Sequence, residues 1–250
     1  MGIFVNLFKK KKKAGAPELN LLTAETPFAI RQAYKSLYTN VLYLNIESEC
    51  KKIAVTSPLP GECKSTVSAN LALMLAENLE DKRVLLIDSD MRSPKVWKLF
   101  DLPRNGKGLS EYLAGIDELP NIQRYGSTRL SILTTGGQSV NPTKLAGSQN
   151  MRKLMEYCAE RFDYVVIDTP PVNVVSDALL LGSFIDGYII SSRSDSSDIN
   201  SISDCVDNIN KTGKDIFGIV LSDVKLKSGN KKYGSNYSRY QAYEKEIVSQ

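Results

Sequence analysis

Short apolar runs alternate with longer amphipathic stretches along most of this 250-residue chain. Six apolar runs of three to six residues follow residue 51, and stretches with helical spacing lie between them. Near-continuous apolar strands separated by helices are typical of a mostly parallel sheet with helices on both faces, so the pattern predicts an α/β fold. The predicted strands are Ile53–Val55, Val84–Ile87, Leu130–Leu133, Tyr164–Ile167, Tyr188–Ile190 and Ile216–Leu221, and the predicted helices are 64–79, 143–161, 176–185 and 197–212.

Both ends of the chain differ from this alternating region. A helix is expected over about 27–45, because Thr26 and Pro27 form a helix-start signal: a hydroxyl cap followed by proline at the first helical position. The last 26 residues lack apolar periodicity and contain Gly, Ser, Asn, Lys and Tyr, which predicts a flexible tail. The expected organisation is a basic arm and linker over 1–26, one domain over 27–224 and a tail over 225–250.

Charge is distributed unevenly along the chain. Residues 1–13 carry five lysines and no acid, and residues 225–250 carry six basic and two acidic groups, which gives +5 and +4. The body over 14–224 has 21 basic and 26 acidic groups, a net charge of −5. This partition argues against a whole-surface nucleic-acid binder and suggests that the termini meet something anionic.

Composition excludes several further classes of protein. Apolar residues make up 42% and charged residues 24%, which are globular values. Histidine is absent, so histidine-dependent triads and histidine-ligated zinc are excluded from this chain. Four scattered cysteines without a Cys-x-x-Cys motif indicate reduced cytosolic thiols. No apolar run approaches the ~18 residues of a membrane span, and we expect a cytoplasmic protein.

A phosphate-binding loop is predicted at SPLPGECKST, residues 57–66, between a strand and a helix. Backbone N–H groups and the helix N-terminus would bind phosphates, Lys64 would reach the β and γ oxygens, and the Ser65 hydroxyl would ligate Mg²⁺. Pro58 and Cys63 stand where the usual motif has glycine, so the loop alone is also compatible with a strand–turn–helix that exposes a lysine. The expected phosphate-binding residues are Gly61, Glu62, Cys63, Lys64, Ser65 and Thr66.

Acidic residues follow two of the predicted strands directly. Asp88 and Asp90 come after Val84–Ile87, and Asp168 comes after Tyr164–Ile167. Ligands bind at the carboxyl ends of strands in open parallel sheets, so these carboxylates and the loop can converge. Each aspartate alone could be a helix cap or a turn residue. Together with the loop they favour a site for Mg²⁺ and nucleotide phosphates.

This combination resembles the bacterial tyrosine kinases, in particular the separate cytoplasmic kinase subunit that acts in capsule and exopolysaccharide synthesis. The resemblance rests on SPLPGECKST (57–66), VLLIDSDMRSPK (84–95), Asn141-Pro142, FDYVVIDTPPV (162–172) and tyrosines near the C-terminus. It implies a P-loop NTPase-like domain that uses ATP and Mg²⁺ as a protein-tyrosine kinase. By this resemblance Asp88 is the general base, Lys64 and Arg92 complete the catalytic set, and Ser65, Asp90 and Asp168 position Mg²⁺.

The resemblance also implies substrates and partners. The family kinases phosphorylate tyrosines in their own tails between neighbouring subunits, and four tyrosines match that cluster. A transmembrane activator protein of polysaccharide co-polymerase type, further copies of the chain and a cognate tyrosine phosphatase are the implied partners. The expected phosphate acceptors are Tyr233, Tyr237, Tyr240 and Tyr243.

The chain departs from the family pattern at several positions. Cys63 replaces the glycine before Lys64; if that position needs a positive φ, Cys costs on the order of 1–2 kcal/mol, and a thiol at a helix N-terminus has the setting for a lowered pKa. Two alternatives therefore stay open: a pseudokinase with impaired nucleotide binding, and an ATPase switch like ParA and MinD. Leu59 occupies the position of the signature lysine of that second group, which favours the kinase.

Assembly and membrane contact are further open points. The family's ring-building pattern in the first helix, acidic-x-x-basic-x-x-Arg, here reads Gln32-x-x-Lys35-x-x-Tyr38, so ring assembly is in doubt although a homo-oligomer is expected. The lysine run Lys9–Lys13 and its apolar neighbours could make a peripheral contact with anionic lipid at the inner face of the membrane. A solvated basic arm is the alternative.

Overall fold

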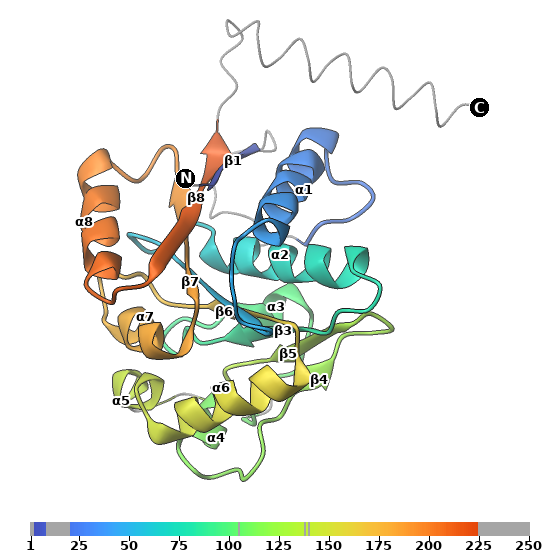
Figure 1. Ribbon diagram of the computed structural model, residues 1–250, viewed down its shortest axis with the longest axis vertical. Coiled ribbons are helices and arrows are strands. Elements are labelled where there is room, and N and C mark those ends of the chain that lie inside the picture. The colour runs from blue at the N-terminus through green and yellow to red at the C-terminus, as the bar shows by residue number, and fades with distance from the viewer. Residues whose placement is uncertain (1–2, 9–20, 105, 138, 140, 225–250) are drawn as a thin grey trace, which may run out of the picture.

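The protein forms one eight-stranded sheet with helices packed on both faces, as seen in a computed structural model (Figure 1). The structure describes residues 21–104, 106–137, 139 and 141–224, and the backbone of 3–8. The strand order is β1-β8-β7-β2-β6-β3-β5-β4, and all neighbouring strands are parallel except β4 and β5. The sequence-based prediction of a mostly parallel α/β sheet is therefore confirmed.

The elements alternate between strands and helices from the first long helix onward. The strands are β1 (Ile3–Phe8), β2 (Lys51–Thr56), β3 (Val84–Asp88), β4 (Gln123–Arg124), β5 (Leu130–Leu133), β6 (Tyr164–Asp168), β7 (Gly187–Arg193) and β8 (Asp215–Val224). The helices are α1 (Phe28–Leu42), α2 (Lys64–Asn78), α3 (Val96–Leu99), α4 (Leu109–Leu113), α5 (Pro142–Ala146), α6 (Gln149–Arg161), α7 (Asp177–Leu180), the 3-10 turn η1 (Leu181–Phe184) and α8 (Ile199–Asn210).

Two hydrophobic cores lie on the two faces of the sheet. In β2, Ile53 and Val55 belong to the core under α1, α2 and α3, whereas Ala54 faces the core under α4 to α8 (Figure 1). Successive strand side chains point to opposite faces, which is why a strand buried on both sides is apolar at every position. The central strands β2, β3 and β6 are therefore held on both faces, and their ends are fixed in space.

Most predicted elements are present, with local differences. The helix predicted over 143–161 is two helices, because the chain turns at Gly147 and Ser148, whose hydroxyl accepts a hydrogen bond from Met151 N at 3.2 Å and caps α6. The hydroxyl cap predicted for α1 is wrong: Pro27 is the N-cap, and Thr26 Oγ1 accepts from Thr23 N instead. Elements β1, β4, α3 and α4 were not predicted.

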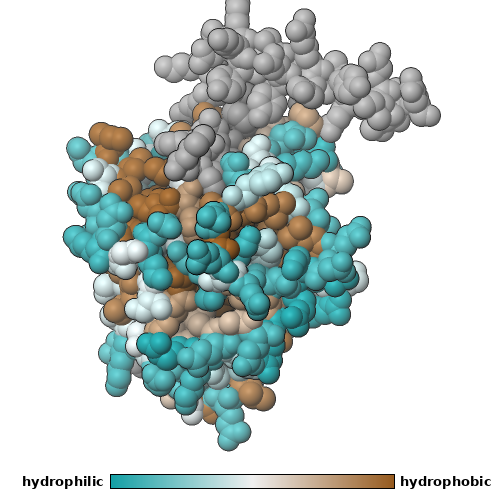
Figure 2. Space-filling view, viewed as in Figure 1, coloured by the Kyte–Doolittle hydropathy of each residue, from teal (hydrophilic) through white to brown (hydrophobic). Residues whose placement is uncertain are grey.

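The described surface is mainly hydrophilic on the face seen in Figure 2, with apolar patches beside α8 and α1. Among the large apolar side chains, Ile199 is 77% exposed. Within the described ranges, no helix has both the length and the apolarity needed to cross a bilayer. Lys9–Lys13, most of the predicted arm and the tyrosine-rich tail over 225–250 lie outside the described residues.

Candidate phosphate-binding and phosphoryl-transfer site

The predicted phosphate loop and the two acidic strand ends meet at the carboxyl edge of three adjacent strands. In the parallel register Asp88 of β3 lies beside Asp168 of β6, and Asp168 lies beside Val55 of β2. Neighbouring strands are about 4.8 Å apart, so the two carboxylates come from adjacent backbone positions. The loop that follows β2 closes over them. The convergence expected from the sequence is present in the structure.

The loop between β2 and α2 has the backbone geometry of a phosphate cradle. Gly61 has φ +82° and Cys63 has φ +61° with ψ +12°, so both residues adopt the left-handed conformation and turn the chain into α2. Lys64 is the first helical residue, which places the side chains of Lys64 and Ser65 and the helix N-terminus at one point. Hydrogen bonds tie the loop to the chain after β6, where Val172 N donates to Ser57 O at 2.9 Å.

Lys64 is buried and paired. Its ammonium lies 2.6 Å from Asp90 Oδ2, and the two side chains are 7% and 2% exposed. Burial works against the charged form, but the carboxylates of Asp168 and Asp90 outweigh it and raise the pKa of Lys64. The lysine therefore stays cationic at the centre of the site, as binding of phosphate oxygens requires.

Asp88 is fully buried at the end of β3. Its Oδ2 accepts hydrogen bonds from Lys95 N at 3.1 Å and Val96 N at 3.0 Å, which fixes the carboxyl against the start of α3. Burial, reinforced by the charge of Asp168, raises the pKa of Asp88 to about 8. A carboxylate with a raised pKa is a stronger proton acceptor than an exposed one, which suits a general base.

Asp168 and Ser65 present polar atoms that the protein leaves without a partner of normal hydrogen-bond geometry. Asp168 Oδ2 and Ser65 Oγ are both buried. Burial raises the pKa of Asp168 to about 6, while the charge of Lys64 and the nearby Ser65 hydroxyl oppose the rise. Buried polar atoms without partners are costly, and an ion or ligand is one explanation. Hard oxygen donors beside a phosphate loop fit Mg²⁺.

Side chains of the described residues do not form a complete metal site by themselves. Within the described ranges, no group of three or more Cys, Asp or Glu side chains is arranged to hold a metal ion. The residues therefore fit an ion held by one or two protein oxygens together with phosphate oxygens and water, which is how Mg²⁺ commonly binds beside nucleotides.

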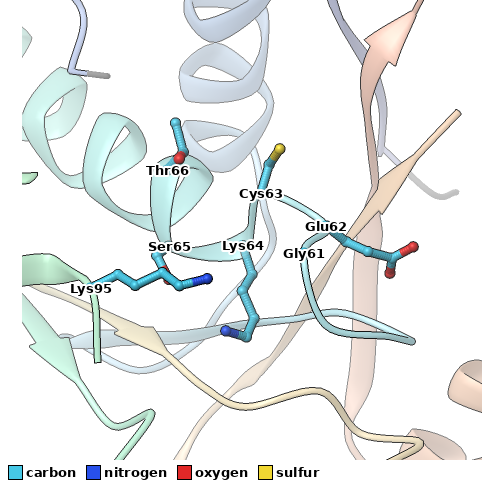
Figure 3. Close-up of a pocket in the computed structure, with 7 residues that line it drawn as sticks. All are labelled: Gly61, Glu62, Cys63, Lys64, Ser65, Thr66 and Lys95. Atoms are coloured by element: carbon cyan, nitrogen blue, oxygen red, sulfur yellow. The ribbon is translucent and has the colours of Figure 1, made fainter. Parts of the chain in front are cut away.

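A hollow of about 310 Å³, open to solvent, lies over the loop and is lined by all six of the predicted phosphate-binding residues (Figure 3). The Glu62 side chain turns away from Lys64 and accepts from Leu59 N at 3.1 Å, so it braces the loop. The residues that line the hollow are Gly61, Glu62, Cys63, Lys64, Ser65, Thr66 and Lys95.

Lys95 is the lining residue that sequence reasoning missed. It lies in the turn after the acidic motif, where a lysine is typical of a solvated surface. The usable signal was its position seven residues after Asp88, in the loop that leaves the same strand end.

Arg92, predicted in the catalytic set, is outside the residues that line the hollow. Its guanidinium makes a bidentate ion pair with Asp177, at 2.8 and 3.1 Å, and donates to Thr143 Oγ1 at 2.8 Å. Asp177 is 1% exposed, whereas the Arg92 side chain is 41% exposed. The arginine thus joins the loop after β3 to the starts of α5 and α7. A direct role of Arg92 in catalysis stays a prediction.

The pKa of the Cys63 thiol differs from the expectation drawn from the sequence. Burial raises the pKa of the Cys63 thiol, with Asp223 and Glu62 adding to the rise and Ser222 and Arg193 opposing it. The lowered pKa expected at a helix N-terminus is therefore wrong, because the thiol is desolvated. Figure 3 shows the Cys63 and Lys64 side chains leaving the backbone on opposite sides. The positive φ considered from the sequence is confirmed.

Fold and site together define a P-loop NTPase of the ParA type. The family profile described as "ParA: NUBPL iron-transfer P-loop NTPase" matches residues 49–233. Among curated proteins, the chain is 30% identical over 227 residues to tyrosine-protein kinase YwqD of Bacillus subtilis (strain 168), covering 90% of this chain and 94% of that one. The chain belongs to the family of bacterial tyrosine-protein kinases.

Two further similarities support this assignment. The chain is 32% identical over 221 residues to tyrosine-protein kinase etk of Escherichia coli (strain K12), which covers 88% of this chain but only 30% of that relative's length. The solved kinase domain of Escherichia coli tyrosine kinase ETK superposes with a TM-score of 0.79 at 28% identity, covering 90% of this chain and 91% of that domain.

Proposed function

We propose that this protein is a protein-tyrosine kinase that uses ATP and Mg²⁺ and phosphorylates its own C-terminal tyrosines, Tyr233, Tyr237, Tyr240 and Tyr243. One observation carries the proposal: Asp88 and Asp168 occupy adjacent register positions beneath a loop whose Lys64 and Ser65 face them. A lysine, a hydroxyl and two buried carboxylates at one strand edge are the groups that phosphoryl transfer requires.

In the proposed reaction, the tyrosine oxygen attacks the γ-phosphorus of ATP, the bond to the β–γ bridging oxygen breaks, and ADP leaves. The hydroxyl proton passes to Asp88, whose backbone hydrogen bonds hold the carboxyl in place. Lys64 binds phosphate oxygens, and Ser65 with Asp168 or Asp90 would hold Mg²⁺. Bound Mg²⁺ would neutralise charge on the transferred phosphoryl group. Positioning and charge neutralisation supply most of the catalysis in this reaction class.

The test is phosphotyrosine mapping by mass spectrometry after incubation with ATP and Mg²⁺. We expect phosphate on the tail tyrosines of the wild-type chain and its loss in Lys64→Ala and Asp88→Asn. The matched controls are Lys211→Ala and Asp215→Asn, which change exposed residues of the same types away from the site. Thermal unfolding of each variant separates loss of chemistry from loss of fold. Unchanged phosphotyrosine in both site variants would refute the proposed roles.

The biological setting follows from the family resemblance and is part of the proposal. We infer a cytoplasmic kinase subunit at the inner face of the membrane, with a transmembrane activator, other copies of the chain and a tyrosine phosphatase as partners, acting in capsular or exopolysaccharide synthesis. Adding the activator's cytoplasmic segment to the mapping assay tests this part, since an activator raises the yield of phosphotyrosine.

The presence of Cys63 in the phosphate loop favours a second candidate function. A non-glycine residue in the left-handed conformation at the phosphate loop is compatible with a pseudokinase that keeps the fold and has lost nucleotide binding. The outcomes separate the candidates: no ATP binding supports the pseudokinase, whereas ATP binding without phosphotyrosine supports an ATPase switch of the ParA and MinD type.

A further inference from the structure

Lys95 is held beside the candidate phosphate site by its own main chain. Its backbone N donates to Asp88 Oδ2 at 3.1 Å, so its Cα is fixed to the carboxyl that ends β3. Its side chain lines the same hollow as the phosphate loop, and Figure 3 shows it extending across the hollow toward Ser65. The side chain is half-buried, so the ammonium remains accessible to a ligand.

The two lysines of the hollow differ in what they bind. The Lys64 ammonium is paired with Asp90 at 2.6 Å. Among the residues that the structure describes, the Lys95 ammonium makes neither a hydrogen bond nor an ion pair, although it is near enough for its charge to lower the pKa of Asp168. An anion entering the hollow must share Lys64 with Asp90, but it meets Lys95 without breaking an existing contact. A free cation on a half-buried stem is suited to bind phosphate oxygens as a point charge.

We propose that Lys95 binds the terminal phosphate of the nucleoside triphosphate, as a second cation beside Lys64. This inference rests on the proposed function and adds a residue to it. Lys95 comes from the loop after β3 that carries Asp88 and Asp90, so it approaches from the side where the phosphate is transferred. The backbone of the phosphate loop and the start of α2 lie on the other side of the hollow. The contact therefore distinguishes a triphosphate from a diphosphate.

The experiment measures binding by calorimetry with the full chain, using Mg²⁺ with a non-hydrolysable ATP analogue and Mg²⁺ with ADP as the two probes. In Lys95→Met and Lys95→Gln the affinity for the analogue should fall about tenfold or more, the size of one charge-assisted contact. The affinity for ADP should stay within about twofold. Lys95→Arg should restore part of the affinity, and Lys98→Met, an exposed lysine of α3, is the matched control.

Three outcomes overturn the inference. Unchanged binding of both probes removes Lys95 from the site, and equal losses for the analogue and ADP remove the assignment to the terminal phosphate. An equal loss of affinity for the analogue in Lys98→Met would show that the effect comes from general surface charge. Any non-proline residue at 95 keeps the main-chain bond to Asp88, so the variants should unfold at the wild-type temperature without nucleotide. Phosphotyrosine production by the wild-type chain reports separately on the proposed function.

Discussion

Cys63→Gly removes a β-carbon from a left-handed residue of the phosphate loop, and the structure gives the size of the effect. Cys63 has φ +61° and ψ +12°. A non-glycine residue in this conformation costs about 1–2 kcal/mol, whereas glycine costs about 0.4–1 kcal/mol through the entropy of the unfolded chain. The midpoints of these two ranges leave a net gain in the free energy of unfolding of about 0.8 kcal/mol. For a chain of this length that is about 1–4 °C in melting temperature.

The same geometry predicts little change in nucleotide affinity. We expect the turn from β2 into α2 to hold this left-handed conformation in the free and the bound protein alike, so its cost cancels in binding. The Cys63 side chain also leaves the backbone on the side opposite Lys64 (Figure 3). The pseudokinase alternative, in which Cys63 impairs nucleotide binding, implies that glycine would raise affinity for ATP. The structure predicts instead a more stable protein whose ATP affinity changes by less than about threefold, which is under 0.7 kcal/mol.

The assay is thermal unfolding combined with calorimetric titration of ATP and Mg²⁺. Cys63→Ala keeps the β-carbon and removes only the thiol, so the difference between the Gly and Ala variants isolates the backbone strain. Gly61→Ala is the reverse test: it adds a β-carbon at φ +82° where no heavy atom lies within 4 Å, so strain without a clash should destabilise the protein. Equal melting temperatures for Cys63→Gly and Cys63→Ala would refute the strain argument, and a tenfold rise in ATP affinity would refute the cancellation.

Two further predictions concern charged contacts. Asp163 accepts from Arg83 N at 2.8 Å and Lys82 Nζ at 3.0 Å; burial opposes the shift, but these bonds lower its pKa overall, so its stabilisation is present above the unfolded pKa and is lost as pH falls through the lower folded pKa. Asp163→Asn should therefore cost about 1 kcal/mol or less near neutral pH. The difference in urea unfolding from wild type should shrink as pH falls and vanish once Asp163 is protonated in the folded protein; a difference that does not shrink on acidification would contradict this. Arg92→Met leaves the buried Asp177 carboxylate with only Thr143, which should lower the free energy of unfolding by about 1–3 kcal/mol in urea titration. Arg129→Met is the exposed control, and equal stability of the two variants would show that the ion pair contributes nothing.

The parts of the fold that the sequence predicted are those with a long and unbroken hydrophobic pattern. Val84–Ile87 and Tyr164–Ile167 are apolar at every position because both faces are covered, and both lie in strands as predicted. The short elements β4 and α4 have too few residues to establish a period. Strand β1 was missed because the lysine run that follows it led to the prediction of a basic arm over the whole segment. Its backbone pairs with β8 instead.

The site residues that could be predicted are the charged residues that directly follow a predicted strand or lie in the loop motif. Asp88, Asp168 and Lys64 follow apolar strands or a loop motif, and a parallel sheet brings such ends together. Lys95 was harder to predict: the sequence places it in the loop after β3, but the hydrogen bond from its backbone to Asp88, which holds it beside the phosphate loop, is visible only in the structure. The raised pKa of the Cys63 thiol depends on burial beside β8, which no local sequence pattern encodes.

The register of the sheet sets the distance that the tail must span for its tyrosines to reach the site of their own molecule. Asp88 is level with Asp168, Val55, Ile189 and Gly218 across five strands. Val224 therefore lies four strand spacings sideways and six residues further along β8, a separation of about 28 Å. A fully extended chain covers about 3.3 Å per residue. Tyr233, nine residues beyond Val224, has barely enough reach, whereas Tyr243 has about twice what is needed, so contour length alone ranks the four tyrosines as acceptors within one chain.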